Sequence, residues 1–165
     1  MNILTKTKNR FWFLLALMVL THITYSQKIT SYKINDLLNR VINSSDTVYV
    51  VNFWATWCKP CVAELPDFNR LDSVYKLKKI KVLLVSLDFK EDISSKLIPF
   101  IKKHNYHAEI IVLDESNGNN FINKISEKWS GAIPATLITQ RNKNVEEFYE
   151  KKLSYDFLVE RLQSK

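Results

Sequence analysis

The sequence predicts an α/β domain in which helices flank a central mixed sheet. Short runs rich in β-branched and aromatic residues alternate with segments whose apolar residues recur at helical spacing. Residues 47–87 follow the order strand, helix, strand, which is typical of a βαβ unit with two parallel strands. Residues 135–149 hold two strand-like runs around a short polar turn, which predicts an antiparallel hairpin.

The N-terminal segment differs in composition from the rest of the chain. A basic start precedes an unbroken apolar run over 11–20, and the polar stretch that follows ends near Ser26. This order is typical of a secretory signal peptide, and the apolar run is too short to cross a bilayer alone. We therefore expect residues 1–26 to be a cleaved signal peptide and residues 27–165 to form one exported, periplasmic domain. An uncleaved membrane anchor is the alternative.

The charge of the remaining chain argues against a nucleic-acid partner. Residues 27–165 carry 21 basic and 17 acidic residues, a net charge of +4. Most of these charges are interleaved, as in 143–152, which indicates a solvated surface and not a basic stripe. We expect the domain to act as a monomer.

The first half of the domain is predicted from apolar spacing. Apolar residues at helical spacing predict a helix over 34–42, and the run TVYVVNFW predicts a buried strand over 47–54. A second helix is expected over 62–74, with a kink at Pro66. The run KVLLVSL predicts the next buried strand, over 81–87.

The middle of the domain adds a further helix and strand. Residues 93–104 have a helical apolar pattern, in which Pro99 predicts a bend or a late start. The run EIIVL predicts a short strand over 109–113, and a polar turn follows at 116–119. The apolar spacing over 121–129 predicts another helix.

The C-terminal part completes the sheet and adds a last helix. Strands over 135–139 and 145–149 are expected to pair across the turn at 140–144. A final helix is expected over 154–162, with Ser154 as its N-cap.

The two cysteines of the chain, Cys58 and Cys61, lie three positions apart where a strand ends and a helix begins. A disulfide between them closes so small a loop that it restrains almost no chain, which favours a chemical role. Cys58 falls at the helix N-terminus, where free N–H groups and the cation of Lys59 favour a thiolate. Pro60 suits a first helical turn, and Cys61 faces back to resolve a mixed disulfide.

Two other uses of the cysteines remain open alternatives. A structural zinc site normally needs four ligands, and the chain has only two cysteines. His104 and His107 belong to a different helix–loop region and are expected to be solvated surface residues. A purely structural disulfide is disfavoured by the small loop. We therefore expect neither a metal nor a cofactor.

Two motifs make the chain resemble the thioredoxin superfamily. Residues 50–61 (VVNFWATWCKPC) are similar to the family's active-site strand, and residues 131–136 (GAIPAT) are similar to the loop that carries its cis-proline. The resemblance covers roughly residues 47–162 and implies a thioredoxin-like fold. The signal segment, the extra helix and strand between 90 and 113, and Glu64 resemble the exported TlpA/ResA branch.

The resemblance also implies roles for individual residues. Pro134 is expected to be the cis-proline opposite the cysteines, and Ile133 to pair with a substrate chain. Trp54 is expected in the core, whereas Trp57 is expected on the apolar surface around Cys58. Thioredoxin has a buried aspartate where this chain has Asn52, so the resemblance implies that Glu64 serves as the proton acceptor for Cys61. A solvent-facing Glu64 is the alternative.

These observations predict a thiol–disulfide oxidoreductase that reduces disulfides of exported proteins. The resemblance implies re-reduction by a membrane-bound electron donor, and apocytochrome c is one candidate substrate. A non-catalytic metal-delivery or binding module on the same fold is the alternative function. A peroxidase is disfavoured because neither cysteine lies in a Thr-x-x-Cys context.

Overall fold

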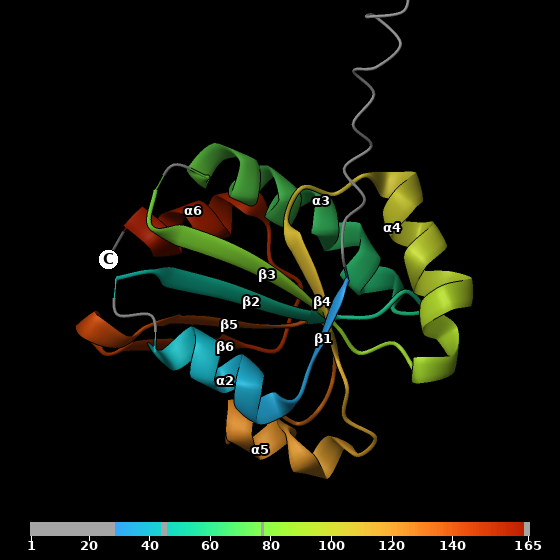
Figure 1. Ribbon diagram of the computed structural model, residues 1–165. Coiled ribbons are helices and arrows are strands. Elements are labelled where there is room, and N and C mark those ends of the chain that lie inside the picture. Colours follow the sequence, from blue (N-terminus) through green and yellow to red (C-terminus); the bar gives the residue numbers. More distant parts are fainter. Residues whose placement is uncertain (1–28, 44–45, 77, 164–165) are drawn as a thin grey trace, which may run out of the picture.

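The computed structural model describes residues 29–43, 46–76 and 78–163. The signal peptide predicted over 1–26 lies outside these residues. Across the described ranges, no helix has both the length and the apolar character needed to cross a membrane. The described chain forms one six-stranded sheet with helices on both faces, as the sequence predicts (Figure 1).

The sheet is mixed, with the strand order β1-β4-β3-β2-β5-β6. Its strands are β1 (Thr30–Tyr32), β2 (Val48–Trp54), β3 (Ile80–Ser86), β4 (Glu109–Leu113), β5 (Ala135–Gln140) and β6 (Val145–Tyr149). The pairs β2–β3, β3–β4 and β4–β1 are parallel, whereas β5 runs antiparallel to both β2 and β6. The predicted parallel pair and the predicted hairpin are therefore both present.

The edge strand β1 is absent from the sequence prediction. It is three residues long and largely exposed, so it offers no apolar run to detect. Its backbone pairs with β4, with Thr30 opposite Ile111 and Tyr32 opposite Leu113. Tertiary pairing, and not local preference, makes this segment a strand.

Helices cover both faces of the sheet (Figure 1). One face carries α3 (Lys59–Tyr75), α4 (Ile98–His104) and α6 (Tyr155–Gln163), and the other carries α2 (Ile34–Asn43) and α5 (Ile122–Ile125). Successive strand residues point to opposite faces, so Val50 and Trp54 of β2 pack in the α3 core while Val51 and Phe53 pack in the α2 core. The same alternation directs Asn52 toward α3.

Most of the predicted helices are confirmed. α3 continues through Pro66 to Tyr75. Pro99 lies in the first turn of α4, so this α-helix starts late, as predicted. Ser154 caps α6, because its Oγ accepts a 3.3 Å hydrogen bond from the N–H of Phe157. Shorter helical segments are η1 (Lys90–Asp92), η2 (Ile93–Leu97), η3 (Gly118–Asn120) and η4 (Arg141–Lys143).

The helix predicted over 121–129 is wrong in its second half. α5 ends at Ile125, and Ser126 is extended at φ −161° and ψ 133°. Trp129 instead packs in an aromatic cluster, with ring centroids 4.9, 5.7 and 5.7 Å from those of Phe53, Phe121 and Phe148. Burial in this cluster, and not a continuing helix, accounts for the apolar residue at position 129.

Candidate active site

The structure joins Cys58 and Cys61 in a disulfide with a Cα–Cα distance of 5.3 Å. Cys58 is the N-cap of α3, and its Sγ accepts a 3.3 Å hydrogen bond from the backbone N–H of Cys61. β2 ends four residues earlier, at Trp54, so the pair lies where strand gives way to helix. The free N–H groups of a helix N-terminus favour an anion, so a thiolate at Cys58 is stabilised there.

The two cysteines differ in accessibility. Cys58 is 6% exposed and Cys61 is 0% exposed, so a partner from solvent reaches Cys58 first. Lys59 and Pro60 are both exposed beside it, and Pro60 lies in the first turn of α3, where its missing N–H costs nothing. The pair therefore combines one slightly accessible cysteine with one that is fully buried.

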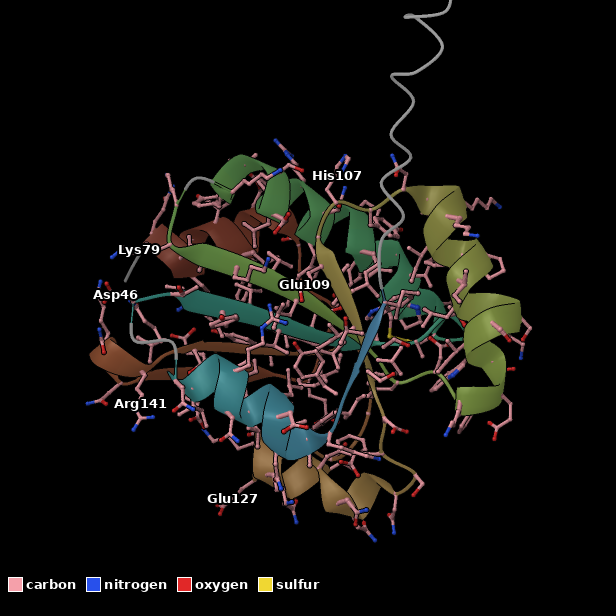
Figure 2. The ribbon with its side chains drawn as sticks, viewed as in Figure 1. Asp46, Lys79, His107, Glu109, Glu127 and Arg141 are labelled. Atoms are coloured by element: carbon pink, nitrogen blue, oxygen red, sulfur yellow. A yellow bond between two sulfur atoms is a disulfide. The ribbon has the colours of Figure 1, made fainter. Side chains whose placement is uncertain are left out.

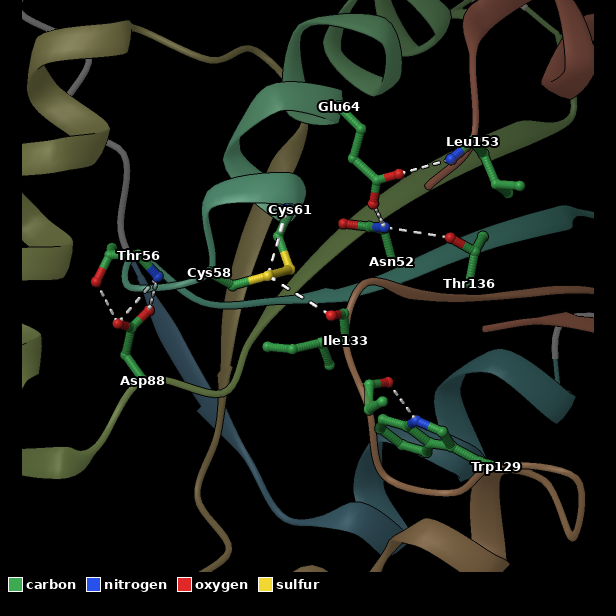
Figure 3. The surroundings of a disulfide bond; sticks show 11 residues. Asn52, Thr56, Cys58, Cys61, Glu64, Asp88, Trp129, Ile133, Thr136 and Leu153 are labelled. Carbon is green, nitrogen blue, oxygen red and sulfur yellow. Dashed lines mark hydrogen bonds between the residues drawn. A yellow bond between two sulfur atoms is a disulfide. The ribbon is translucent and has the colours of Figure 1, made fainter. Parts of the chain in front are cut away.

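The loop opposite the disulfide contains the expected cis bond, between Ile133 and Pro134. The carbonyl oxygen of Ile133 lies 3.7 Å from the Sγ of Cys58 (Figure 3). The loop is held on its other side by Trp129, whose indole N–H donates a 2.8 Å hydrogen bond to the carbonyl of Ala132. Residues 58 and 133, far apart in sequence, thus meet at one site.

Glu64 is fully buried, so the solvent-facing alternative is wrong. Its Oε1 accepts a 2.7 Å hydrogen bond from the Nδ2 of Asn52, and its Oε2 accepts one of 2.8 Å from the backbone N–H of Leu153 (Figure 3). Glu64 follows Cys61 by three residues, which places both on one side of α3. The helix therefore turns a carboxyl into the core beneath the cysteine pair.

Burial raises the pKa of Glu64 from 4.5 to about 7, and the hydrogen bonds from Leu153 and Asn52 only partly oppose this effect. A carboxyl with a pKa near neutrality exchanges protons readily under physiological conditions. Glu64 thus has the chemistry of a general acid or base.

Asn52 occupies the centre of this buried group. Its Nδ2 donates to the carboxylate of Glu64 and, at 3.1 Å, to the Oγ1 of Thr136. Its Oδ1 is buried and has no hydrogen-bond partner among the described residues. In Figure 3 this oxygen points to the side on which the disulfide lies.

A second carboxyl near the site, that of Asp88, has no counterpart in the sequence prediction. It accepts hydrogen bonds from the backbone N–H of Thr56 and from its hydroxyl, and Ser86 donates to it at 2.8 Å. Trp54 pairs with Ser86 in the parallel strands β2 and β3, so Thr56 and Asp88, each two residues further along, also lie side by side. Asp88 thereby fixes the loop that precedes Cys58.

The surface next to Cys58 is aromatic. Trp57 is 53% exposed, as expected for the apolar surface, whereas Trp54 is buried in the core. The ring of Trp57 stacks on that of Phe89, which is 64% exposed, with centroids 6.4 Å apart. Phe89 lies in the loop after β3, and an isolated phenylalanine in a loop belongs to no periodic pattern from which its position could be predicted.

The two histidines considered as metal ligands are exposed, as expected, and Figure 2 shows His107 at the outer surface. His104 stacks on Tyr106 with ring centroids 5.5 Å apart. Among residues 29–43, 46–76 and 78–163, no three His, Cys, Asp or Glu side chains come together as a metal-binding group.

The fold and the site define a thioredoxin-like protein with a Cys-x-x-Cys pair at a helix N-terminus. The chain belongs to the AhpC/TSA family, whose model matches residues 25–148. Over 110 residues it is 34% identical to the thiol-disulfide oxidoreductase ResA of Oceanobacillus iheyensis, covering 66% of this chain and 52% of that protein. The chain thus spans about half the length of this curated relative.

Solved structures share the fold. A thioredoxin-related protein from Neisseria meningitidis serogroup B superposes with a TM-score of 0.63 at 23% identity, covering 75% of this chain and 91% of that one. StoA from Bacillus subtilis superposes with a TM-score of 0.56 at 21% identity, covering 72% and 84% of the two chains. The thioredoxin-like fold expected from the sequence is therefore confirmed.

Proposed function

We propose that this protein is a thiol–disulfide oxidoreductase that reduces disulfides in partner proteins. The observation that carries the proposal is the unequal burial of Cys58 and Cys61 at the N-terminus of α3. The similarity to a thiol-disulfide oxidoreductase, ResA, supports the same reaction class. No bound cofactor is required, because the two sulfur atoms carry the electrons themselves.

The reaction begins when the thiolate of Cys58 attacks a sulfur of the substrate disulfide. The substrate S–S bond breaks, a mixed disulfide forms, and the departing substrate sulfur takes a proton from water. Cys61 then loses its proton and attacks the Sγ of Cys58. The mixed disulfide breaks, and the second substrate sulfur leaves as a thiolate that takes a proton from water. Two electrons have passed to the substrate, and the protein returns to the Cys58–Cys61 disulfide of the structure.

Glu64 is the proposed acceptor for the proton of Cys61. Its buried carboxyl has a pKa of about 7, close to the pKa at which a general base works best in neutral solution. The aspartate that serves thioredoxin in the neighbouring strand is replaced here by Asn52, which cannot take up a proton. The negative charge of Glu64 is held by the hydrogen bonds from Asn52 and Leu153.

The proposed substrate surface surrounds Cys58. Trp57 supplies exposed apolar area, and Lys59 and Pro60 are exposed at the start of α3. Ile133 and Pro134 form the opposite side, where the backbone of the loop is available to an extended substrate segment. A polypeptide with an accessible disulfide fits these requirements.

We place the protein outside the cytoplasm, as a monomer that is re-reduced by a membrane-bound dithiol donor. The composition of residues 1–26 supports export. The tiny loop that the disulfide closes supports a redox role in an oxidising compartment, where a reductase needs an electron supply. Disulfide-bonded apocytochrome c is one substrate to test.

The deciding experiment is the reduction potential of the Cys58–Cys61 pair, measured in glutathione and dithiothreitol buffers. A value below about −220 mV supports a reductase, and a value above about −160 mV would mean a disulfide-forming oxidant. Cys58→Ser should abolish reduction of a protein disulfide, whereas Cys61→Ser should accumulate the mixed disulfide. Full activity of Cys58→Ser would refute the proposal.

A further inference from the structure

The orientation of the Asn52 amide follows from its neighbours. An ionised carboxylate only accepts hydrogen bonds, so the NH₂ group of Asn52 must face Glu64, at the observed 2.7 Å. The second N–H of this group is directed to the Oγ1 of Thr136 at 3.1 Å. Both donors are therefore used, and the carbonyl oxygen is left facing the other way.

That carbonyl oxygen is an anomaly in the oxidised protein. It is buried and has no donor among the described residues, although buried polar atoms nearly always have a partner. Asn52 lies on the α3 face of β2, and Figure 3 shows its oxygen turned to the side of the disulfide. In the disulfide the sulfur of Cys61 carries no hydrogen, so Cys61 cannot donate a hydrogen bond to the carbonyl oxygen of Asn52.

Reduction changes the chemistry of Cys61 and not that of Asn52. Uptake of two electrons and one proton converts the disulfide into the Cys58 thiolate and the Cys61 thiol, and this thiol becomes a hydrogen-bond donor. Cys61 is completely buried, so water does not compete for this donor. A buried donor and an unpartnered buried acceptor then lie on the same side of β2.

We propose that Asn52 is a positioning residue whose carbonyl oxygen accepts a hydrogen bond from the Cys61 thiol in the reduced protein. This inference rests on the proposed redox function of the cysteine pair. The amide then bridges Cys61 and Glu64, with its oxygen toward the proton to be lost and its nitrogen toward the base that receives it. One side chain thus aligns the donor and the acceptor of the proton.

The bridge should alter the redox equilibrium. The oxidised protein has a buried acceptor without a donor, whereas the reduced protein has a bonded pair, so Asn52 favours reduction. Asn52→Ala should shift the equilibrium toward the disulfide by about three- to tenfold, which lowers the reduction potential by about 15 to 30 mV. The measurement belongs at pH 8, where the Glu64 carboxylate is ionised and fixes the amide orientation.

Thr136→Val is the matched control. It removes the other partner of the Asn52 Nδ2 from the same buried group but leaves the carbonyl oxygen in place. We expect the equilibrium constant for reduction of this variant to stay within about twofold of that of the unaltered protein. The lost hydrogen bond between Asn52 and Thr136 does not involve the Cys61 thiol, so its loss affects the oxidised and the reduced protein alike. An Asn52→Ala equilibrium that is unchanged, or that shifts no more than Thr136→Val, would overturn the proposal.

A spectroscopic measurement keeps the test independent of the folding of Asn52→Ala. Cys58→Ala leaves Cys61 as the single thiol and removes the Cys58 thiolate as a rival acceptor. In this protein the infrared S–H stretching band should lie at lower frequency than that of an alkyl thiol in an apolar solvent, because a carbonyl acceptor weakens the S–H bond. A band at the frequency of the free thiol would overturn the inference.

The two proposals fail in different ways. The redox equilibrium and the S–H band are both measured without a protein substrate. Absence of protein-disulfide reduction, with the Asn52→Ala shift intact, would refute the proposed function alone. Reduction that depends on Cys58, with no Asn52→Ala shift, would refute the role of Asn52 alone.

Discussion

The side-chain amide of Asn52 donates a 2.7 Å hydrogen bond to the carboxylate of Glu64, and both residues are fully buried between β2 and α3. A charge in such a place loses its hydration, and hydrogen bonds from Asn52 and Leu153 recover only part of that loss. The protein therefore keeps a carboxyl group that is costly to ionise directly beneath its cysteine pair. This cost has consequences for stability and for reactivity.

The first prediction concerns stability against pH. The pKa of Glu64 is about 7 in the folded protein and near 4.5 when unfolded, so between these values the folded state binds more protons. The free energy of unfolding should thus fall as pH rises from about 4.5 to 7, with Glu64 accounting for about 3 kcal/mol. Urea denaturation of the oxidised protein across this range measures the effect.

Glu64→Gln provides the comparison, because glutamine does not titrate. As pH rises from about 4.5 to 7, the free energy of unfolding should fall for the unaltered protein but not, on this account, for Glu64→Gln, so the variant should become relatively more stable. Parallel stability curves for the two proteins would show that Glu64 titrates normally.

The second prediction concerns the resolving step. Glu64→Gln should slow the attack of Cys61 on the mixed disulfide by about 100-fold, because the thiol loses its proton acceptor. In the unaltered protein this step should accelerate as pH rises through about 7, the pKa at which Glu64 becomes a base. Stopped-flow measurement of substrate release separates it from the attack by Cys58, which should be little affected. An unchanged pH profile in Glu64→Gln would contradict this role.

The third prediction concerns the exposed aromatic pair of Trp57 and Phe89. Phe89→Ser should raise the KM for a protein disulfide about fivefold, because about 1 kcal/mol of apolar contact is lost. The rate with a small disulfide such as hydroxyethyl disulfide should stay the same. Val74→Ser, which alters an exposed side chain at the far end of α3, is the control and should change neither value. Equal KM values for Phe89→Ser and Val74→Ser would exclude Phe89 from the substrate surface.

The fourth prediction concerns Asp88, which holds the loop before Cys58 through Thr56. Asp88→Ala leaves the N–H of Thr56 and the hydroxyl of Ser86 without this acceptor, and should lower the free energy of unfolding by about 1–3 kcal/mol. It should also slow attack by Cys58. Asp92→Ala removes only an exposed ion pair with Lys96, so its cost should be below about 0.5 kcal/mol. Denaturant titration of both variants measures these changes. An equal loss of unfolding free energy in Asp88→Ala and Asp92→Ala would contradict the anchoring role of Asp88.

Local sequence patterns were sufficient to predict much of the fold and the position of the cysteine pair. The apolar runs of β2 and β3 and the helical spacing in α2 and α3 are visible in sequence because burial imposes a period on side-chain type. The spacing of Cys58 and Cys61, directly after a buried strand, is a local signal as well. These features lie within a few residues of one another along the chain.

Contacts between segments far apart in the sequence determined the features that local patterns did not predict. β1 is a strand only because β4 lies beside it, and Trp129 leaves the helical pattern to join aromatic side chains from other segments. The sequence by itself determined the fold class, the position of the cysteine pair and the presence of a carboxyl at position 64. Only the tertiary structure decided that Glu64 is buried, that Asn52 and Leu153 bond to it, and that Asp88 anchors the active-site loop. The reason is physical: desolvation and hydrogen-bond partners come from segments far apart in sequence, and no local pattern encodes them.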